Sequence, residues 1–298
     1  MKLNLDFYTE DEKNVLDEKV KEQLEKYFLN IDCNLEINEN TSVDDYLILT
    51  DSRKNIVSWY EFKNNANVLE LNPNLGEITG FLCEKFKDVV CISDSKEKGF
   101  AISNRYAKNK NLEIIVANYK KVNFSKNFDY VLIIGEENYE NLIDKIKFAK
   151  EHLANDGKIL VAFNNKFGMQ YWTGIKAKEK EQYSTITGKT KGITLDKVEN
   201  EIERLSLKHK VYYPLPDYKL TNAIFSDKYL PDAENMMSRN LVYAKEDEYC
   251  EFGQREAYIE LLKENKDKFK LFANSYFIEI SNENIQNDIR YVNFELYR

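Results

Sequence analysis

The segment Val68-Leu69-Glu70-Leu71-Asn72-Pro73-Asn74-Leu75-Gly76 decides how this chain folds. Its first four residues predict a buried strand, and apolar residues recur at helical spacing directly after it, at Ile78, Phe81, Leu82 and Phe86. The chain must therefore turn sharply between residues 72 and 76. A strand-turn-helix unit of this kind places a crevice at the carboxyl end of a parallel strand, with helix-terminal N–H groups directed into it.

The turn itself contains few of the glycines that a ligand-binding turn would have. Only Gly76 remains, and Asn72 and Asn74 occupy the other two positions. Asparagine tolerates a left-handed backbone better than most residues, so we expect the turn to form, although its side chain takes up room that a ligand would need. These residues leave two interpretations open: a pocket for an adenosyl-type nucleotide cofactor, or an ordinary strand-to-helix turn without a ligand.

Five short apolar runs, most of them separated by helix-length segments, predict a parallel α/β sheet. They cover residues 68–71, 89–92, 113–116, 130–134 and 159–163. Between the last two runs, a helical period from Tyr139 to Leu153 is expected to stop at Asn155-Asp156-Gly157. A doubly wound sheet binds its ligand where the strand order reverses, and the turn at 72–76 lies beside the first strand, at that point.

Both ends of the chain are expected to add elements to this core. Thr9 and Glu12 fit a capping box before a helix whose apolar face runs to Phe28. In the C-terminal part we expect, in chain order, a helix capped by Thr194, a strand over 208–213 that ends at Pro214, and strands over 276–280 and 291–296. We therefore predict an N-terminal helical and irregular extension at 1–47, a cofactor-binding core at 48–175, and an α+β part at 176–298 that completes the sheet and the acceptor pocket.

The composition excludes several classes of protein. The 298-residue chain is 43% hydrophobic, enough for a sizeable core, and its formal net charge of −8 opposes general binding to nucleic acid. It has no apolar run of about 18 residues and no basic-then-apolar start, so we expect a cytoplasmic protein without membrane insertion. Four widely spaced cysteines and only two histidines, His152 and His209, argue against a metal site or a disulfide framework.

Six segments carry a resemblance to a known family. They are IVSWYEF (56–62), VLEL (68–71), GEITG (76–80), NKFGMQYWTG (165–174), YYPLPDYKL (212–220) and SDKYLP (226–231). The first three resemble class I S-adenosylmethionine-dependent methyltransferases. The last three are more specific and resemble a bacterial branch associated with surface-glycan biosynthesis, sometimes fused to glycosyltransferases. The resemblance extends over residues 48 to 296.

This resemblance implies a Rossmann-like, doubly wound, mostly parallel sheet that binds S-adenosylmethionine. Its first turn would hold the methionyl part, an acid after the second strand the ribose, and a residue after the third strand the adenine. The sequence has Ser93 at the acidic position, with Asp94 one residue beyond, and Asn118 where an aspartate is common. The expected cofactor-binding residues are Glu70, Asn72, Asn74, Gly76, Ser93, Asp94, Asn118 and Gly135.

Methyl transfer from a sulfonium is an in-line displacement, so most of the acceleration can come from holding the acceptor close and aligned. An amine or hydroxyl acceptor also loses a proton, and Asp217 with Tyr171 is our catalytic candidate. Asp217 lies between Pro216 and Tyr218, where it could instead cap a structural turn. Side chains after strand ends are expected to bind the acceptor, although aromatic residues near a sheet are often core: Asn164, Asn165, Trp172, Tyr213, Tyr218 and Lys219.

The sequence therefore favours a methyltransferase that acts on an oxygen or nitrogen of a small-molecule or carrier-linked glycan precursor, in association with glycan-assembly enzymes. Two alternatives stay open. One is a degenerate module that binds or scaffolds in glycan assembly, and the other is a nucleotide-sugar binding protein that uses the same crevice. Because comparable segments of that family continue into further domains, Arg298 ends either a whole protein or a piece of one.

Overall fold

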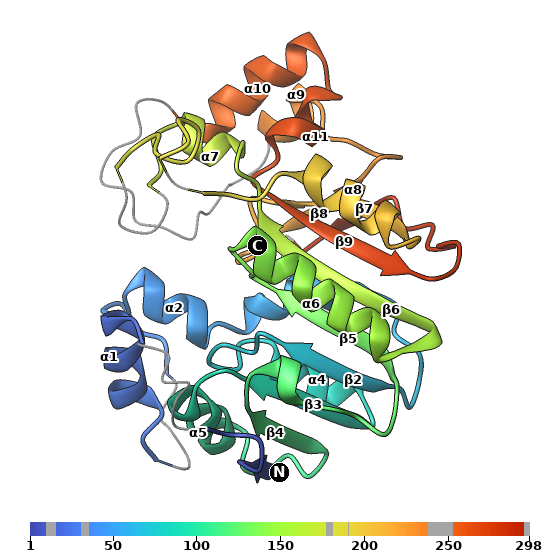
Figure 1. Cartoon of the computed structure of the whole chain (residues 1–298). Helices are drawn as coiled ribbons and strands as arrows, with labels where there is room; N and C mark the ends of the chain where they lie inside the picture. Colours follow the sequence, from blue (N-terminus) through green and yellow to red (C-terminus); the bar gives the residue numbers. More distant parts are fainter. Residues whose placement is uncertain (10–15, 31–35, 177–180, 190, 238–252, 295–298) are drawn as a thin grey trace. The chain divides into compact units, whose positions relative to one another are not determined.

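The computed structural model describes residues 1–9, 16–30, 36–176, 181–189, 191–237 and 253–294 (Figure 1). The chain divides into two compact units. The N-terminal unit comprises Met1–Lys54, Tyr60–Ile134 and Lys145–Leu160. The C-terminal unit comprises Asn55–Trp59, Gly135–Asp144 and Val161–Arg298.

The N-terminal unit contains the predicted parallel sheet. Its strands lie in the order β1-β4-β3-β2-β5-β6, and β1/β4, β4/β3, β3/β2 and β2/β5 all pair in parallel. The strands are β1 (Lys2–Asn4), β2 (Asn67–Leu71), β3 (Asp88–Ser93), β4 (Leu112–Val116), β5 (Phe128–Ile134) and the first part of β6 (Leu153–Asn164). The order reverses at β2, as in a Rossmann-like sheet, so the predicted fold class is confirmed.

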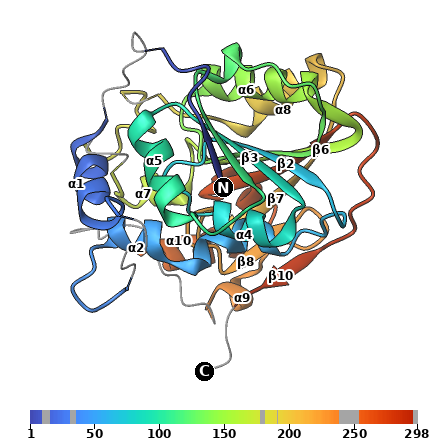
Figure 2. The same cartoon turned by 90° about the horizontal axis from the view of Figure 1, so that it is seen from below.

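Helices flank these strands, as the predicted fold class requires. The helix α4 (Thr79–Lys85) follows β2, α5 (Lys96–Arg105) follows β3, and α6 (Tyr139–Glu151) follows β5. Figure 2 shows α4 and α5 on one side of β2 and β3 and α6 on the other.

The predicted end of the helix after β5 is wrong. The helix α6 ends at Glu151, and β6 begins at Leu153, so Asn155-Asp156-Gly157 lies within the strand. Between the helix and the strand, the Phe128 N–H donates to the His152 carbonyl (2.9 Å), which holds the chain beside the start of β5, a contact between residues too far apart in the sequence for a local pattern to indicate.

Two N-terminal helices, α1 (Glu18–Tyr27) and α2 (Val43–Leu49), pack against the turn that follows β2. Phe28, Ile48 and Leu49 form one buried cluster with Leu75 of the turn and Ala101 of α5. The helix α1 is the one predicted near the start of the chain, but its cap is Asp17, which accepts from the Lys19 N–H (2.9 Å). Of the expected capping box, Glu12 lies outside the described residues.

The sheet of the C-terminal unit contains three antiparallel strand pairs. The order is β6-β9-β7-β8-β10, and β9/β7, β7/β8 and β8/β10 pair antiparallel. The strands after β6 are β7 (Lys208–Leu215), β8 (Ala223–Ser226), β9 (Ser275–Ser281) and β10 (Tyr291–Asn293). The strand β7 continues past the predicted stop, since Pro214 lies opposite Ile224 and Leu215 opposite Ala223.

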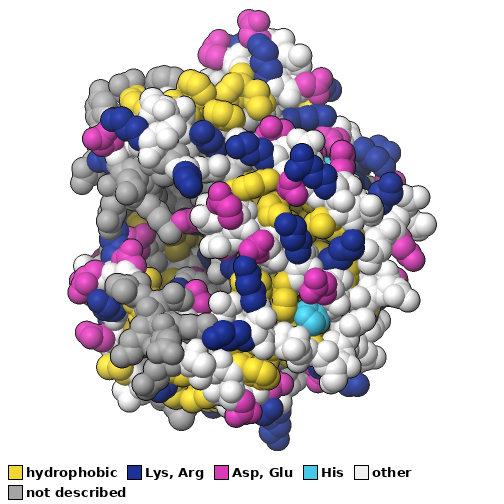
Figure 3. All heavy atoms as spheres, viewed as in Figure 1, with side chains coloured by type: hydrophobic (Ala, Val, Ile, Leu, Met, Phe, Trp, Pro, Cys, Tyr) yellow, Lys and Arg dark blue, Asp and Glu magenta, His cyan; other side chains and the backbone are white. Residues whose placement is uncertain are grey.

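Among the described residues, six helices lie wholly within the C-terminal unit. They are α3 (Asn55–Ser58), α7 (Met169–Trp172), α8 (Leu195–Arg204), α9 (Ala233–Met237), α10 (Gln254–Glu264) and α11 (Lys268–Phe272). The helix α8 starts after Thr194 as predicted, although the Thr194 side chain makes no capping hydrogen bond. Among the helices of the described ranges, none has the length and hydropathy needed to cross a membrane. On the face shown in Figure 3, basic and acidic side chains are interspersed.

Candidate functional site

The turn after β2 adopts a left-handed backbone at the three predicted positions. The φ angles are +117° at Asn72, +44° at Asn74 and +83° at Gly76. Asparagine therefore replaces glycine here without loss of the turn, as expected from its tolerance of positive φ. The Asn72 Nδ2 donates to the Ile134 carbonyl (3.2 Å), and the Asn74 Nδ2 donates to Glu77 Oε1 (2.6 Å), so both amides are anchored on the protein.

The start of helix α4 is joined to β2 through the Glu70 carboxylate. Glu70 is buried, and its Oε2 accepts from Thr79 Oγ1 (2.7 Å) and from the Cys91 thiol (3.1 Å). Burial raises the pKa of Glu70 to about 7, because the protein interior disfavours the charged form more than these two donors stabilise it. Glu70 thus faces the protein interior in this unit, and its expected contact with a cofactor stays a prediction.

The residue at the carboxyl end of β3 has a different environment from the one that follows it. Ser93 is buried and its hydroxyl donates to the Ser95 carbonyl (2.9 Å), so it is part of the turn into α5. Asp94 is exposed and comes directly after the strand. Of the two residues considered from sequence, Asp94 is therefore the one with an exposed side chain, and its contact with a ligand stays a prediction.

Asn118 follows β4 and caps a short 3₁₀ helix (Tyr119–Lys121). Its Oδ1 accepts from the Lys120 N–H (3.0 Å), and its side chain is exposed. The adjacent Ala117 N–H donates to the Ser93 carbonyl (2.9 Å), which fixes the end of β4 beside the end of β3. Asn118 is thus close to the β3–α5 turn, with one lone pair of its amide oxygen already used.

Sequence reasoning missed two residues whose side chains donate hydrogen bonds to backbone carbonyls of the turn. The Tyr106 hydroxyl donates to the Gly76 carbonyl (2.6 Å), and Arg105 Nη1 donates to the Leu75 carbonyl (3.1 Å). Both residues lie at the end of α5. Their side-chain hydrogen bonds reach back 30 residues in the sequence, and no local pattern signals such a contact.

In the C-terminal unit, four of the predicted site residues lie together. Gly135 has φ +86°, and a Cβ at this position would lie 3.2 Å from the Tyr218 hydroxyl. Tyr171 is buried, which raises its pKa, and the neighbouring Tyr218, Glu137 and Asp217 raise it further. The structure therefore brings together Gly135, Tyr171, Asp217 and Tyr218.

Asp217 takes part in a structural turn. It is buried, and its Oδ1 accepts from the N–H groups of Lys219 (2.8 Å) and Leu220 (3.0 Å). This is the capping geometry that the sequence left open as an alternative to catalysis. The Lys219 ammonium lies 5.8 Å from the centre of the Tyr218 ring. A role of Asp217 as base stays a prediction, and it has to be compatible with this turn.

Asn165 uses its whole side chain for backbone hydrogen bonds. Its Nδ2 donates to the carbonyls of Leu271 and Ala273 (2.8 Å each), and its Oδ1 accepts from the Phe167 N–H (3.0 Å). Asn165 is buried as well. Its side chain therefore fixes the segment after β6 against the end of α11 and the residue that follows this helix.

A buried asparagine that sequence reasoning missed connects the segments 165–174 and 212–220, which are both rich in aromatic residues. The Asn274 Oδ1 accepts from the Gln170 N–H (2.8 Å), and its Nδ2 donates to the Pro216 carbonyl (2.9 Å) and to Gln254 Oε1 (3.0 Å). Asn274 precedes β9 and lies 104 residues from Gln170 in the chain. It positions the segments that carry Tyr171 and Asp217.

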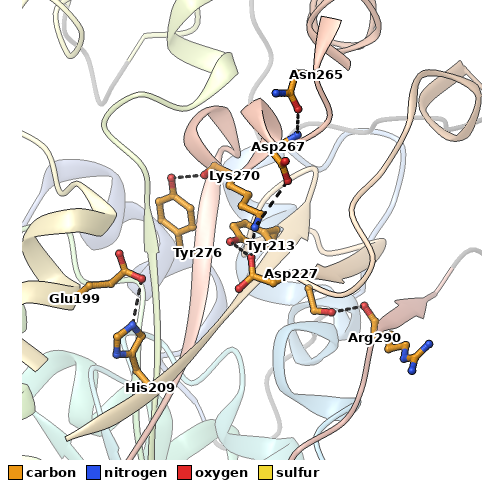
Figure 4. Close-up of polar contacts among 10 residues, drawn as sticks. Glu199, His209, Tyr213, Asp227, Asn265, Asp267, Lys270, Tyr276 and Arg290 are labelled. Carbon is orange, nitrogen blue, oxygen red and sulfur yellow. Dashed lines mark hydrogen bonds and ion pairs between the residues drawn. The ribbon is translucent and has the colours of Figure 1, made fainter. Parts of the chain in front are cut away.

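The other predicted acceptor residues lie in different surroundings. The Tyr213 hydroxyl donates to Asp227 Oδ1 (2.9 Å), which also pairs with the Lys270 ammonium (2.8 Å), as Figure 4 shows. Trp172 is 42% exposed and donates to the Phe167 carbonyl (3.2 Å). The Asn164 Oδ1 is buried and has no hydrogen-bond partner among the described residues.

The described part of the chain contains no group of three or more His, Cys, Asp and Glu side chains that could hold a metal ion.

The chain is similar in fold to several solved methyltransferase structures. The plantazolicin methyltransferase BamL, in complex with a triazolic desmethylPZN analog and SAH, aligns over 89% of this chain and 90% of its own, with 13% identity and a TM-score of 0.46. Phosphoethanolamine N-methyltransferase 1 of Haemonchus contortus aligns over 91% of this chain and 50% of its own, with 11% identity and a TM-score of 0.48. An S-adenosylmethionine-dependent methyltransferase from Clostridium acetobutylicum aligns over 84% of this chain and 94% of its own, with 10% identity and a TM-score of 0.43. Neither a protein-family model nor a curated protein matches the chain.

Proposed function

We propose that this protein transfers a methyl group from S-adenosylmethionine to an oxygen or nitrogen atom of its substrate. The observation that carries the proposal is the turn at Asn72, Asn74 and Gly76, which has positive φ at all three residues and lies where the strand order reverses. Ligands of doubly wound sheets bind at this point. The exposed Asp94 carboxylate follows the neighbouring strand β3.

The residues of the N-terminal unit fit this cofactor. When bound, S-adenosylmethionine supplies an electrophilic methyl group on a positively charged sulfur. The turn at 72–76 is proposed to hold its methionyl part, because its backbone has positive φ at Asn72, Asn74 and Gly76 and the amides of Asn72 and Asn74 are held by protein groups. Asp94 is the proposed acceptor for the ribose hydroxyls, and Asn118 the proposed contact for the adenine.

The C-terminal unit contains the residues proposed to bind the methyl acceptor and to remove its proton. The acceptor atom forms a bond to the methyl carbon, the sulfur–carbon bond breaks, and the proton of the acceptor has to leave. Asp217 is the proposed base or orienting group. Tyr171 cannot serve as a base near neutral pH, because burial raises its pKa and keeps the phenol protonated, so its proposed role is to donate a hydrogen bond to the acceptor.

The proposed substrate is a small-molecule or carrier-linked glycan precursor, methylated in the cytoplasm in association with glycan-assembly enzymes. The support is the resemblance of NKFGMQYWTG (165–174) and YYPLPDYKL (212–220) to a branch with that role. Asn274 holds these two segments through hydrogen bonds to Gln170 and Pro216. Such aromatic segments suit sugar-like ligands, since Tyr and Trp combine a flat apolar face with a polar tip.

Calorimetric titration with S-adenosylmethionine and with S-adenosylhomocysteine tests the proposal. We expect both to bind, and Gly76→Val to abolish binding, because its backbone has φ +83° and the added Cβ would lie 2.8 Å from the Tyr106 ring. Gly188→Val is the matched control. It introduces a side chain at a similar φ of +81°, but no atom of the described chain lies within 4 Å of the new Cβ.

A non-catalytic module is the second candidate, because one oxygen of Asp217 and the amide oxygen of Asn118 already accept backbone N–H groups. Under this alternative the wild type binds neither form of the cofactor at millimolar concentration and methylates no glycan precursor. A nucleotide sugar added to the same titration distinguishes the remaining alternative. Binding of the nucleotide sugar without binding of S-adenosylhomocysteine would contradict the methyltransferase proposal.

A further inference from the structure

The ring of Tyr106 occupies space that two glycines leave open. A Cβ on Gly76 would lie 2.8 Å from Tyr106 Cε2, and a Cβ on Gly80 would lie 2.8 Å from Tyr106 Cε1 and 3.1 Å from its hydroxyl oxygen. A Cβ atom does not lie closer than about 3 Å to a heavy atom of another side chain in a packed protein, so either added Cβ would force the Tyr106 ring to move. Gly76 ends the turn and Gly80 lies in the first turn of α4. The phenol is therefore fitted against the junction of turn and helix, where any larger residue would displace it.

The polar groups at the end of α5 fix the same junction. The Tyr106 hydroxyl donates to the Gly76 carbonyl at 2.6 Å, and the Gly76 N–H donates to the Pro73 carbonyl at 2.7 Å. Both backbone groups of Gly76 are thus engaged, which sets the orientation of its peptide planes. Arg105 donates to the Leu75 carbonyl and lies 5.4 Å from the centre of the Tyr106 ring.

From these contacts we infer that Tyr106 is a positioning residue for the cofactor turn. It touches no reacting atom in this scheme and acts through the backbone of Gly76, whose left-handed conformation sets the path of the turn. The inference rests on the proposed binding of S-adenosylmethionine at that turn. Its physical basis is preorganisation, since a turn held in its binding conformation does not have to be ordered when the ligand arrives.

Affinity for S-adenosylhomocysteine tests the role of the hydroxyl. Tyr106→Phe keeps the ring and removes the hydrogen bond to Gly76, so we expect binding about three- to tenfold weaker, the usual effect of one lost hydrogen bond. Tyr130→Phe is the matched control in the same unit, because the Tyr130 hydroxyl accepts from the backbone N–H of Lys63 (3.0 Å), away from the turn. If Tyr106 had a structural role alone, Tyr106→Phe would lower the melting temperature, as we expect of the control, and leave the affinity at the wild-type value.

A stability cycle with Gly80 tests the fit of the ring without any ligand. Gly80→Ala should lower the melting temperature when Tyr106 is present, because the new Cβ meets the ring. It should raise the melting temperature in the Tyr106→Ala background, since alanine favours a helix more than glycine does. Equal effects in both backgrounds would contradict the packing that the inference requires.

The two measurements separate failure of the inference from failure of the proposed function. If the wild type binds no S-adenosylhomocysteine, the proposed function and the cofactor role of Tyr106 both fail, while the stability cycle still shows whether the ring supports the turn. If the wild type binds and Tyr106→Phe binds equally well, the proposed function stands and the positioning role is wrong.

Discussion

The buried Glu70 carboxyl makes the stability of this protein depend on pH in an unusual direction. Its pKa is raised from an ordinary value of 4.5 to about 7, with burial as the main cause and hydrogen bonds from Thr79 and Cys91 acting against it. Glu77 contributes a further small increase through its negative charge. We predict that Glu70→Gln removes this dependence, because glutamine is a neutral side chain of nearly the same shape that can still accept from Thr79.

The sign and size of the effect follow from the two pKa values. Since the folded chain holds its proton more tightly than the unfolded chain, the contribution is fully present below about pH 4.5 and is lost as the pH rises through about 7. The difference between 4.5 and about 7 corresponds to about 3 kcal/mol, at about 1.4 kcal/mol for each pH unit. The wild type should therefore lose up to about this amount relative to Glu70→Gln between mildly acidic and mildly alkaline pH.

Urea unfolding of the two proteins, at intervals from about pH 5 to about pH 8 with the cysteines kept reduced, measures this difference. Other titrating groups cancel in the comparison. His152, for example, has a lowered pKa and would on its own make both proteins less stable as the pH falls through its titration range. Parallel curves for wild type and Glu70→Gln would refute the reasoning, because they would mean that Glu70 titrates alike in the folded and unfolded chains.

Three further predictions concern the candidate site. Asp94→Ala should weaken binding of S-adenosylhomocysteine by about 1.5 to 3 kcal/mol, the value of a charge-assisted hydrogen bond, and Ser93→Ala should have a smaller effect. A calorimetric titration in which Ser93→Ala loses more affinity than Asp94→Ala would contradict this prediction. Asp217→Asn keeps an amide oxygen that can accept from the Lys219 and Leu220 N–H groups, so we expect an unchanged melting temperature. Methyl transfer should be slowed about 100-fold or more, because the variant has no carboxylate base. Full activity of the variant on the true acceptor would mean that Asp217 has only a structural role. Asn274→Ala leaves the Gln170 N–H and the Pro216 carbonyl without this partner and should lower the free energy of unfolding by about 3 kcal/mol. Urea titrations measure this loss, with the exposed Asn265→Ala as control. A loss no larger than that of the control would contradict the prediction.

The parallel core could be predicted because its determinants are local. Each of the five apolar runs lies within one strand, and the turn at 72–76 needs only residues that tolerate positive φ, as Asn72, Asn74 and Gly76 do. The element boundaries were less predictable. The short strands β1 (Lys2–Asn4) and β8 (Ala223–Ser226) were missed, since three or four residues carry too little periodicity and their pairing partners lie far away in the chain.

The chemistry of the candidate site depended on contacts that no local pattern contains. The sequence by itself determined the sharp turn at 72–76 and the parallel α/β class of the strands around it, and it left Ser93 and Asp94 open as the residue after the second strand of the core. Only the tertiary structure decided that Tyr106 packs on Gly76 and that Asn274 holds the segments of Tyr171 and Asp217. Periodicity reports which face of an element is buried, whereas the hydrogen-bond partner of a buried polar group is chosen by whichever distant residue the fold brings within reach.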